Sequence, residues 1–368
     1  MRKVLIDIIA GARPNFMKVA PIIRSIRARQ QAGVAFEYRL VHTGQHYDSR
    51  MSGDFFLQLE IPHPDVNLGV GSGTQAEQTA GIMISYEKLL TERPCDLCLV
   101  VGDVTSTMAC SIAAQKMGVK VAHVEGGIRS GDWTMPEEIN RMVTDAISNW
   151  FFTTSETANR NLKSSGVSED RIFFVGNTMI DTLLANWDRL RRPAFWEPYG
   201  LEANNYFVLT LHRPANVDGA GELAKLLKAI LEGSRGMPVI FPVHPRTAKT
   251  LQCLGHLPEN LRFVEPQPYL EFNYLVKHSR AVITDSGGIT EETTVMGVPC
   301  MTLRNNTERP ETVSLGTNEL LGTDPAALKP ALDRLFGGMW KKGSIPELWD
   351  GKAGDRIISV LEILFSER

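Results

Sequence analysis

Apolar runs of strand length recur along the whole chain, and each ends in a polar residue, a glycine or a proline. They include VLIDIIAG, YRLVHTG, LCLVVGD, VAHVEGG, FFVGN, YFVLTLHRP, VIFPVHP, AVITDSGG and CMTLR. Longer segments of helical period, such as MACSIAAQKMG and NRMVTDAISN, separate them. This alternation is typical of parallel sheets covered by helices on both faces. Open α/β sheets place ligands at the carboxyl ends of their strands, so the polar residues there are the candidate functional groups.

Chain length and one break in this rhythm predict two domains. The 368 residues are enough to bury two cores. The segment NWDRLRRPAFWEPYGLEANN, rich in proline and charge, interrupts the alternation near mid-chain. We therefore expect an α/β protein of two doubly wound, Rossmann-like domains, residues 1–170 and 171–352, with the active site in the cleft between them. The final amphipathic segment, residues 353–368, is expected to pack back on the first domain.

Composition narrows the cellular compartment and the binding partners that we expect for the protein. The 43% hydrophobic and 22% charged residues are ordinary for a globular enzyme, and a net charge of -3 offers no general attraction for nucleic acid or an acidic membrane. The start, MRKVLIDIIAGARP, has too short an apolar run for a secretory signal, and we expect a cytoplasmic protein without a membrane partner. Five cysteines suit reduced thiols, and the single C-x-x-C at Cys95 and Cys98 is expected in the core.

The segment VITDSGGITEE, residues 282–292, predicts a nucleotide site. Gly287 and Gly288 let a ligand approach the backbone, and a helix that begins there points its N–H groups at an anion such as phosphate. Carboxylates repel phosphate, so a glutamate one turn into the helix, Glu291 or Glu292, should face sugar hydroxyls. The pattern favours a nucleoside diphosphate with its ribose.

Cationic side chains follow several other strands. They are Arg13 and Lys18 in GARPNFMKVAP, His212 and Arg213 in TLHRPANVD, His244 and Arg246 in FPVHPRT, and Arg304 and Arg309 in RNNTERPE. Each alone could be a solvated or structural residue, but their repetition at strand ends favours an anionic ligand. The chain contains no G-x-G-x-x-G, G-x-x-x-x-G-K-[ST] or H-E-x-x-H motif, so neither dinucleotide redox chemistry nor ATP hydrolysis is indicated.

Carboxylates follow strands of the first half. Asp103 lies in VVGDVTSTMA, Glu125 in HVEGG, and Glu137 and Glu138 at the start of a predicted helix. Asp103 could be a helix N-cap, and acids in a first helical turn often only complement the dipole. Glu125 has no such simple structural role, because it stands between an apolar strand and two glycines. If three of these carboxylates converge, their mutual repulsion would raise at least one pKa toward neutrality, which suits acid–base catalysis.

Taken in order, the motifs GARPNFMKVAP, HTGQHYD, VVGDVTSTMA, HVEGGIRS, PEEINR, FVGNTMIDTL, TLHRPANVD, PVHPRT, TDSGGITEE and RNNTERPET resemble those of the non-hydrolysing UDP-N-acetylglucosamine 2-epimerases. The resemblance covers nearly the entire chain. It implies the glycosyltransferase-B fold, a homodimer, a UDP-sugar in the interdomain cleft, and no metal or nicotinamide cofactor. It also implies that UDP is held by Arg13, His212, Ser286, Gly287, Glu292 and Arg309, with Glu292 on the ribose. Lys18, Arg213, His244 and Gly288 complete the expected nucleotide set.

The family's reaction inverts C2 of the sugar by elimination. UDP leaves C1 as the C2 proton departs, which gives a 2-acetamidoglucal, and UDP adds back after reprotonation on the other face. The motif positions assign the proton transfers to Asp103, Glu125 and Glu137 without saying which residue removes the proton and which returns it. His212 is expected to act on the leaving phosphate.

Other readings of the same motifs remain open. A glycosyltransferase of this fold could share the UDP site, a hydrolysing epimerase would release UDP and free sugar, and a nucleotide-sugar sensor would only bind. The segment RSGDWTMPEE is shorter than in the best-known bacterial members and is similar to that of relatives that act on UDP-2,3-diacetamido-2,3-dideoxyglucuronic acid. That uronate is therefore an alternative substrate.

The resemblance also concerns a second substrate-binding site that many bacterial members use for activation. Its glutamines and its arginine correspond here to Gln45, followed by His46, Tyr47 and Asp48, and to Ser72. Loss of the arginine removes a bidentate phosphate clamp, and the aspartate adds repulsion. We therefore expect that the substrate alone drives closure of the cleft.

Overall fold

The computed structural model describes residues 3–44, 58–217, 219–243 and 258–366. The chain divides into two compact units, unit 1 with Met1–Ala185 and Glu347–Arg368 and unit 2 with Asn186–Pro346. The division falls later than the boundary expected at residue 170. The reason is that β7 (Ile172–Phe174) pairs with β6 (Trp150–Thr153) and so belongs to the first sheet.

Unit 1 is built on a parallel sheet with the strand order β3-β2-β1-β4-β5-β6-β7 in the described residues. The other strands are β1 (Val4–Ala10), β2 (Phe36–His42), β3 (Val66–Asn67), β4 (Leu97–Val101) and β5 (Lys120–Val124). In the register, Ile8 of β1 lies beside Leu40 of β2 and Leu99 of β4, and all three are fully buried. These strands are largely apolar because helices cover both faces. Asp7 of β1 and Arg39 of β2 are buried exceptions that pair with each other.

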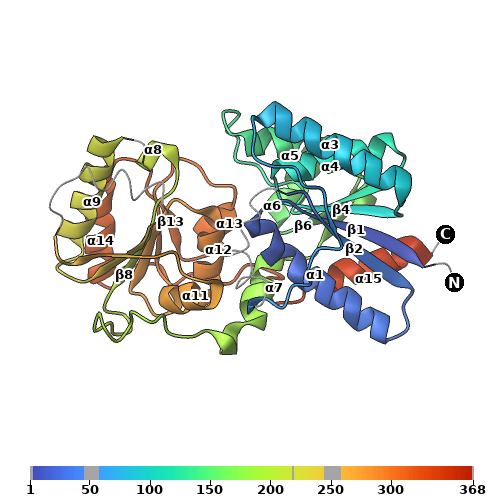
Figure 1. Ribbon diagram of the computed structural model, residues 1–368. Coiled ribbons are helices and arrows are strands. Elements are labelled where there is room, and N and C mark those ends of the chain that lie inside the picture. The colour runs from blue at the N-terminus through green and yellow to red at the C-terminus, as the bar shows by residue number, and fades with distance from the viewer. Residues whose placement is uncertain (1–2, 45–57, 218, 244–257, 367–368) are drawn as a thin grey trace. The chain divides into compact units, whose positions relative to one another are not determined.

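The helices of unit 1 form two layers (Figure 1). They are α1 (Arg13–Gln31), α3 (Gln75–Glu92), α4 (Thr105–Lys116), α5 (Pro136–Ile147), α6 (Glu156–Ser164), α7 (Thr178–Ala185) and α15 (Ala353–Ser366). Helices α3, α4 and α5 pack together on one face of the sheet, and α1, α7 and α15 pack together on the other. The strand order reverses between β1 and β4, which is the switch point where such sheets bind ligands.

Unit 2 repeats this plan with a parallel sheet in the order β10-β9-β8-β11-β12-β13. The strands are β8 (Phe207–Thr210), β9 (Val239–Pro242), β10 (Leu261–Val264), β11 (Ala281–Thr284), β12 (Cys300–Thr302) and β13 (Asn318–Leu320). The helices are α8 (Pro214–Val217), α9 (Ala220–Gly233), α11 (Tyr269–Lys277), α12 (Gly287–Met296), α13 (Pro310–Ser314) and α14 (Leu328–Phe336). Its switch point lies between β8 and β11. The predicted class of two doubly wound, Rossmann-like sheets is confirmed.

Both faces of the second sheet are apolar. Leu209 and Ile283 belong to one buried cluster, with α9 and α14. Their neighbours Val208 and Val282 belong to the cluster on the opposite face. Alternate residues of one strand therefore enter different cores, and polar groups are left to the strand ends.

The C-terminal segment is anchored to unit 1 by buried polar contacts. Asp181 of α7 accepts hydrogen bonds from the backbone N–H groups of Ala353 (3.1 Å) and Gly354 (2.7 Å) at the start of α15. Burial raises the pKa of Asp181 to about 6. A Cβ at Gly354 would lie 2.8 Å from the Pro21 carbonyl oxygen, so glycine permits the close approach of α15 to α1.

The cysteine side chains are buried or partly buried in the described residues. Cys98, Cys110 and Cys300 are buried and Cys95 is partly buried, all with free thiols, and burial raises the pKa of the Cys98 thiol well above its ordinary value. Such thiols are core residues and poor nucleophiles. Across the described ranges, no helix is long and apolar enough to span a bilayer.

Replacing Asp181 by Ala is expected to lower the free energy of unfolding by about 1–3 kcal/mol, because two buried N–H groups lose their acceptor. Urea denaturation would measure the loss. The matched control is Asp350→Ala, which removes a partly exposed partner of Arg356 and should cost less, about 0–1 kcal/mol. Equal losses in the two variants would contradict the anchoring role of Asp181.

Candidate functional site

The carboxyl ends of β1, β4 and β5 bring Lys18, Gly102 and Glu125 together in unit 1. Lys18 Nζ lies 2.7 Å from Glu125 Oε2, and both side chains are largely buried. Gly102 follows β4 with φ +69, and a Cβ there would lie 3.2 Å from Lys18 Nζ and 3.7 Å from Glu125 Oε2. Glycine thus lets the ion pair lie against the backbone that leads into Asp103.

Glu125 holds a strained backbone conformation. Its φ is +71, although it is not a glycine, and only 3% of the residue is exposed. Its N–H donates to the Phe152 carbonyl on β6 (2.9 Å), so the sheet fixes the position. Such a conformation costs about 1–3 kcal/mol and clusters at functional sites. This outlier supports the functional role that the sequence predicts for Glu125.

Helix α5 holds Asp103 through two consecutive residues. Arg141 donates to Asp103 Oδ2, and Asn140 Nδ2 donates to the Asp103 carbonyl oxygen (2.8 Å). Arg141 also donates to Glu138 (2.7 Å). The Asp103 side chain keeps 29% exposure, so it can still reach a ligand.

The adjacent acids Glu137 and Glu138 differ in their surroundings. Glu138 is buried and accepts from the backbone N–H groups of Ser130 (3.0 Å) and Gly131 (3.0 Å), which fixes the loop before α5. Burial alone would raise the pKa of Glu138, but these bonds and Arg141 outweigh it, and the net shift is downward. Glu137 is half-buried in the first turn, and its side chain makes no hydrogen bond to any described residue.

The carboxylates do not form the uncompensated cluster that the sequence suggested. Asp103 faces Arg141, which also binds Glu138, and Glu125 faces Lys18, so the charges of Asp103 and Glu125 are compensated. Lys18, expected to meet a phosphate, has a carboxylate as its partner in this structure. Arg13 begins α1, and only its backbone position is described.

In unit 2, Asp285 organises the ends of β8 and β11. Its carboxylate lies 2.7 Å from His212 Nδ1 and accepts from the Arg213 backbone N–H (2.9 Å) and from Asn216 Nδ2 (3.0 Å). Burial alone would raise the pKa of Asp285, but these groups reverse the effect and the pKa lies below its ordinary value. Sequence analysis gave Asp285 no role, although its place directly before Ser-Gly-Gly at a strand end was the available signal.

The partners of Asp285 remain open to a ligand. The His212 side chain is 58% exposed, and since Nδ1 is bound to Asp285, Nε2 is the nitrogen left for a ligand. Ser286 is the N-cap of α12 but its hydroxyl makes no capping bond, and residues 286–288 are only half-buried. The first N–H groups of α12 are therefore suited to bind an anion.

Glu291 and Glu292 of α12 contact different partners. Glu292 Oε1 accepts from the Tyr269 hydroxyl (3.0 Å) and Asn273 Nδ2 (3.4 Å), which leaves Oε2 for a ligand hydroxyl. Burial raises the pKa of Glu292 to about 7. Glu291 Oε1 accepts from Arg309 Nε (2.5 Å), so Arg309, an expected UDP contact, is held against α12.

Other predicted residues lie elsewhere in the chain. Arg304 forms two 2.8 Å bonds with Glu308, close to Gly287. His244, Arg246 and residues 45–48 lie outside the described residues, and Ser72 is exposed in the segment before α3.

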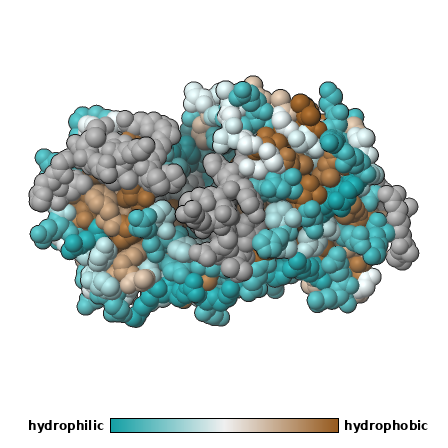
Figure 2. Space-filling view, viewed as in Figure 1, coloured by the Kyte–Doolittle hydropathy of each residue, from teal (hydrophilic) through white to brown (hydrophobic). Residues whose placement is uncertain are grey.

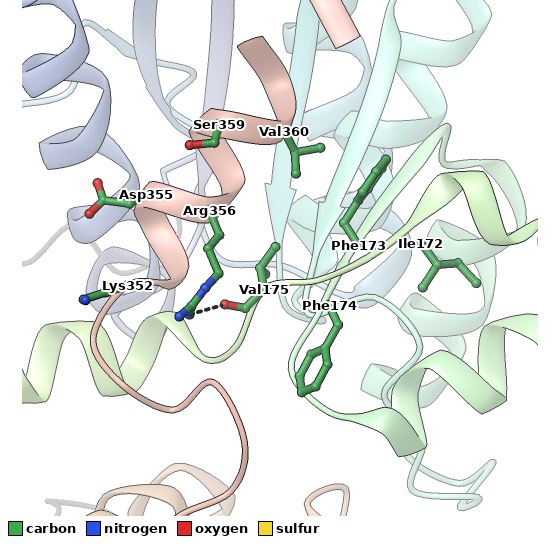
Figure 3. Close-up of a pocket in the computed structure, with 9 residues that line it drawn as sticks. All are labelled: Ile172, Phe173, Phe174, Val175, Lys352, Asp355, Arg356, Ser359 and Val360. Atoms are coloured by element: carbon green, nitrogen blue, oxygen red, sulfur yellow. Dashed lines mark hydrogen bonds between the residues drawn. The ribbon is translucent and has the colours of Figure 1, made fainter. Parts of the chain in front are cut away.

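Two surface pockets are lined mostly by residues other than the candidate functional groups. A pocket of about 530 Å³ lies between the edge strand β7 and α15, where Arg356 donates to the Val175 carbonyl (Figure 3). None of the predicted site residues lines it. A second pocket, of about 500 Å³, is formed by α3, α4 and α5, in the region where Figure 2 shows apolar surface.

Comparison with known proteins gives one consistent family. A family model described as UDP-N-acetylglucosamine 2-epimerase matches residues 28–362. The UDP-N-acetylglucosamine 2-epimerase of Methanocaldococcus jannaschii is 39% identical, over 97% of this chain and 98% of that protein. The UDP-2,3-diacetamido-2,3-dideoxy-D-glucuronate 2-epimerase of Pseudomonas aeruginosa is 38% identical, over 85% of this chain and 87% of that protein. The crystal structure of the M. jannaschii enzyme in complex with UDP-GlcNAc and UDP superimposes with a TM-score of 0.87 at 38% identity, covering 98% of this chain and 100% of that chain.

Glu292 is expected to make stability depend on pH. Its folded pKa of about 7 exceeds the ordinary value of 4.5, so the folded protein keeps a proton that the unfolded chain releases between these values. The stabilisation from this proton is complete at low pH and is lost as pH rises toward 7. Urea titrations across this range should therefore show a steeper fall for the wild type than for Glu292→Gln. Burial also raises the pKa of the Glu311 carboxyl to about 7, but Glu311 is present in both proteins and affects both curves equally. Parallel curves would therefore contradict the expectation for Glu292.

Proposed function

The chain belongs to the UDP-N-acetylglucosamine 2-epimerase family, and we propose that it interconverts UDP-N-acetylglucosamine and UDP-N-acetylmannosamine without net hydrolysis. The observation that carries this proposal is the strained, buried Glu125 paired with Lys18 beside Asp103. Nucleotide binding alone would not require such a group. Inversion at C2 requires it, because a C–H bond must break and form again.

Most of the groups expected to bind the nucleotide lie in unit 2. The N-terminus of α12 offers N–H donors to a diphosphate. His212 Nε2 donates when the ring is protonated, because Nδ1 already faces Asp285. Arg13, which begins α1 in unit 1, is assigned to the diphosphate by resemblance. Glu292 Oε2 is suited to accept hydrogen bonds from ribose hydroxyls, because Tyr269 and Asn273 already hold Oε1. These donors would stabilise the charge that develops on the leaving UDP.

The proposed reaction is an elimination followed by an addition. A carboxylate takes the C2 proton, the C1–O bond to the diphosphate breaks, and a C1–C2 double bond forms in the 2-acetamidoglucal. A proton is then delivered to the other face of C2, and UDP adds back to C1. Asp103, Glu125 and Glu137 are the candidates for the two proton transfers, and Lys18 favours the ionised form of its partner Glu125.

The diacetamido uronate is the second candidate substrate. The P. aeruginosa relative named for it is nearly as similar as the M. jannaschii enzyme, and the short segment between Arg129 and Glu137 also favours it. Both substrates would undergo the same C2 chemistry.

The resemblance further supports a cytoplasmic homodimer that works without a metal or nicotinamide cofactor. Light scattering of the purified protein would give its mass in solution. Turnover that persists in the presence of a chelator, with no nicotinamide added, would support the absence of a cofactor.

Proton NMR in deuterated water tests the reaction directly. Incubation with UDP-N-acetylglucosamine, and separately with the diacetamido uronate, should produce new anomeric signals of the C2 epimer from the true substrate, with deuterium at C2. A glycosyltransferase would leave the UDP-sugar unchanged without an acceptor, and a hydrolysing enzyme would accumulate free sugar and UDP. Full retention of the original C2 proton during epimerisation would exclude the elimination.

Removal of the candidate acids should separate chemistry from binding. Asp103→Asn, Glu125→Gln and Glu137→Gln are each expected to lower kcat roughly 100-fold or more, the scale of lost acid–base catalysis, with little change in UDP affinity. Arg13→Ala and Glu292→Ala should instead weaken UDP binding, measured by calorimetry.

The matched control for Glu137 is Glu156→Gln, an exposed acid in the first turn of α6. This variant should turn over like the wild type. Near-normal turnover in Glu125→Gln and Glu137→Gln together would remove the catalytic assignment.

A further inference from the structure

His123 on β5 is a fully buried histidine whose two ring nitrogens both have hydrogen-bond partners. Nε2 lies 2.8 Å from the Gly102 carbonyl oxygen, and Nδ1 lies 2.7 Å from Asp145 Oδ1. A carbonyl oxygen only accepts, and so does an ionised carboxylate. A ring that donates from both nitrogens, an imidazolium, is therefore the form that fits both partners.

Asp145 of α5 completes this buried cluster. Its other oxygen, Oδ2, accepts from the Gly127 backbone N–H (3.0 Å) and from Arg129 Nη1 (2.6 Å). Burial alone would raise the pKa of Asp145, but His123 and Arg129 outweigh it and bring the pKa below its ordinary value. Two cations thus surround one carboxylate, and the cluster carries an excess positive charge.

The cluster links the two loops that carry the candidate acids. The Gly102 carbonyl belongs to the peptide unit that leads into Asp103, and Gly127 and Arg129 follow Glu125 in the next loop. Asp145 contributes from α5, the helix that also supplies Arg141 to Asp103. A single buried network therefore joins both loops to α5.

We propose that the His123–Asp145 pair is a positioning device for the epimerisation, which holds Asp103 and Glu125 in their working arrangement. The proposal rests on the proposed function. Stability alone is a weak reason for such a cluster, because apolar packing of equal volume is often as stable as a buried ion pair. The excess positive charge of the cluster also favours the ionised forms of the Asp103 and Glu125 carboxylates.

Other charged groups surround the same loops. Lys18 of α1 pairs with Glu125. Arg141 of α5 pairs with Asp103 and with Glu138 of the same helix. These groups stay in place when His123 is changed. A change in the pH dependence of turnover would therefore report the cluster itself.

Two conservative variants test the proposal with UDP-N-acetylglucosamine, or with the uronate if that is the substrate. His123→Gln and Asp145→Asn are expected to lower kcat roughly 10- to 100-fold, the cost of a small misplacement of reacting groups. KM and UDP affinity should change little, because neither residue belongs to the nucleotide set. In His123→Gln the acidic limb of the pH–rate profile should move to higher pH, since a cation near the carboxylates is lost.

The matched control is Asp181→Asn, the same change at a buried carboxylate that only anchors α15. It should lower thermal stability without changing kcat or the pH profile. If the two cluster variants behave like this control, with lower stability and unchanged kcat, the positioning role is overturned.

Nitrogen-15 NMR of the wild-type imidazoles gives a readout that needs no turnover. The His123 ring should show two protonated nitrogens at neutral pH, and a neutral ring would overturn the proposal. Wild-type activity distinguishes the two hypotheses: absence of epimerisation refutes the proposed function, whereas an active wild type with equally active cluster variants refutes only the positioning role.

Discussion

Burial of both faces of each parallel sheet leaves the strand ends as the main places for polar chemistry. Val208 and Leu209, adjacent in β8, enter opposite apolar clusters, so an unpaired polar side chain on either face of this strand would be buried in a core. The carboxyl ends at each switch point are the places where backbone and side chains can meet a ligand. In unit 1 the Lys18–Glu125 pair lies against Gly102, which follows β4, and in unit 2 His212 follows β8.

Charges placed so close to an apolar core need partners, and this need shapes both sites. Glu125 has Lys18, Asp103 has Arg141, and Asp285 has His212. Removing one member of a buried pair costs about 3–5 kcal/mol, because the remaining charge is left without compensation. A substrate that contacts a paired carboxylate oxygen must therefore compete with the cation already bound there.

Sequence patterns predicted the parts of the sites that are local. Glu125 could be found because it follows an apolar strand directly, and the Ser-Gly-Gly turn identified the start of α12. Asp145 and Arg141 lie within α5, and their partners come from loops distant in sequence, so no local pattern reveals them. The domain division was placed too early for a similar reason: the pairing of β7 with β6 depends on tertiary structure.

Two Glu-Glu pairs show how neighbouring acids can take separate roles. Successive residues of a helix point about 100° apart, so adjacent side chains face different surroundings. In α5, Glu138 turns inward to the loop at residues 130–131 and leaves Glu137 without a described partner. In α12, Glu291 binds Arg309, while Glu292 is held by Tyr269 through one oxygen only. In each pair the structural acid anchors the turn from which its neighbour is presented, so the positions of the catalytic and ribose-binding candidates depend on residues that contact no ligand.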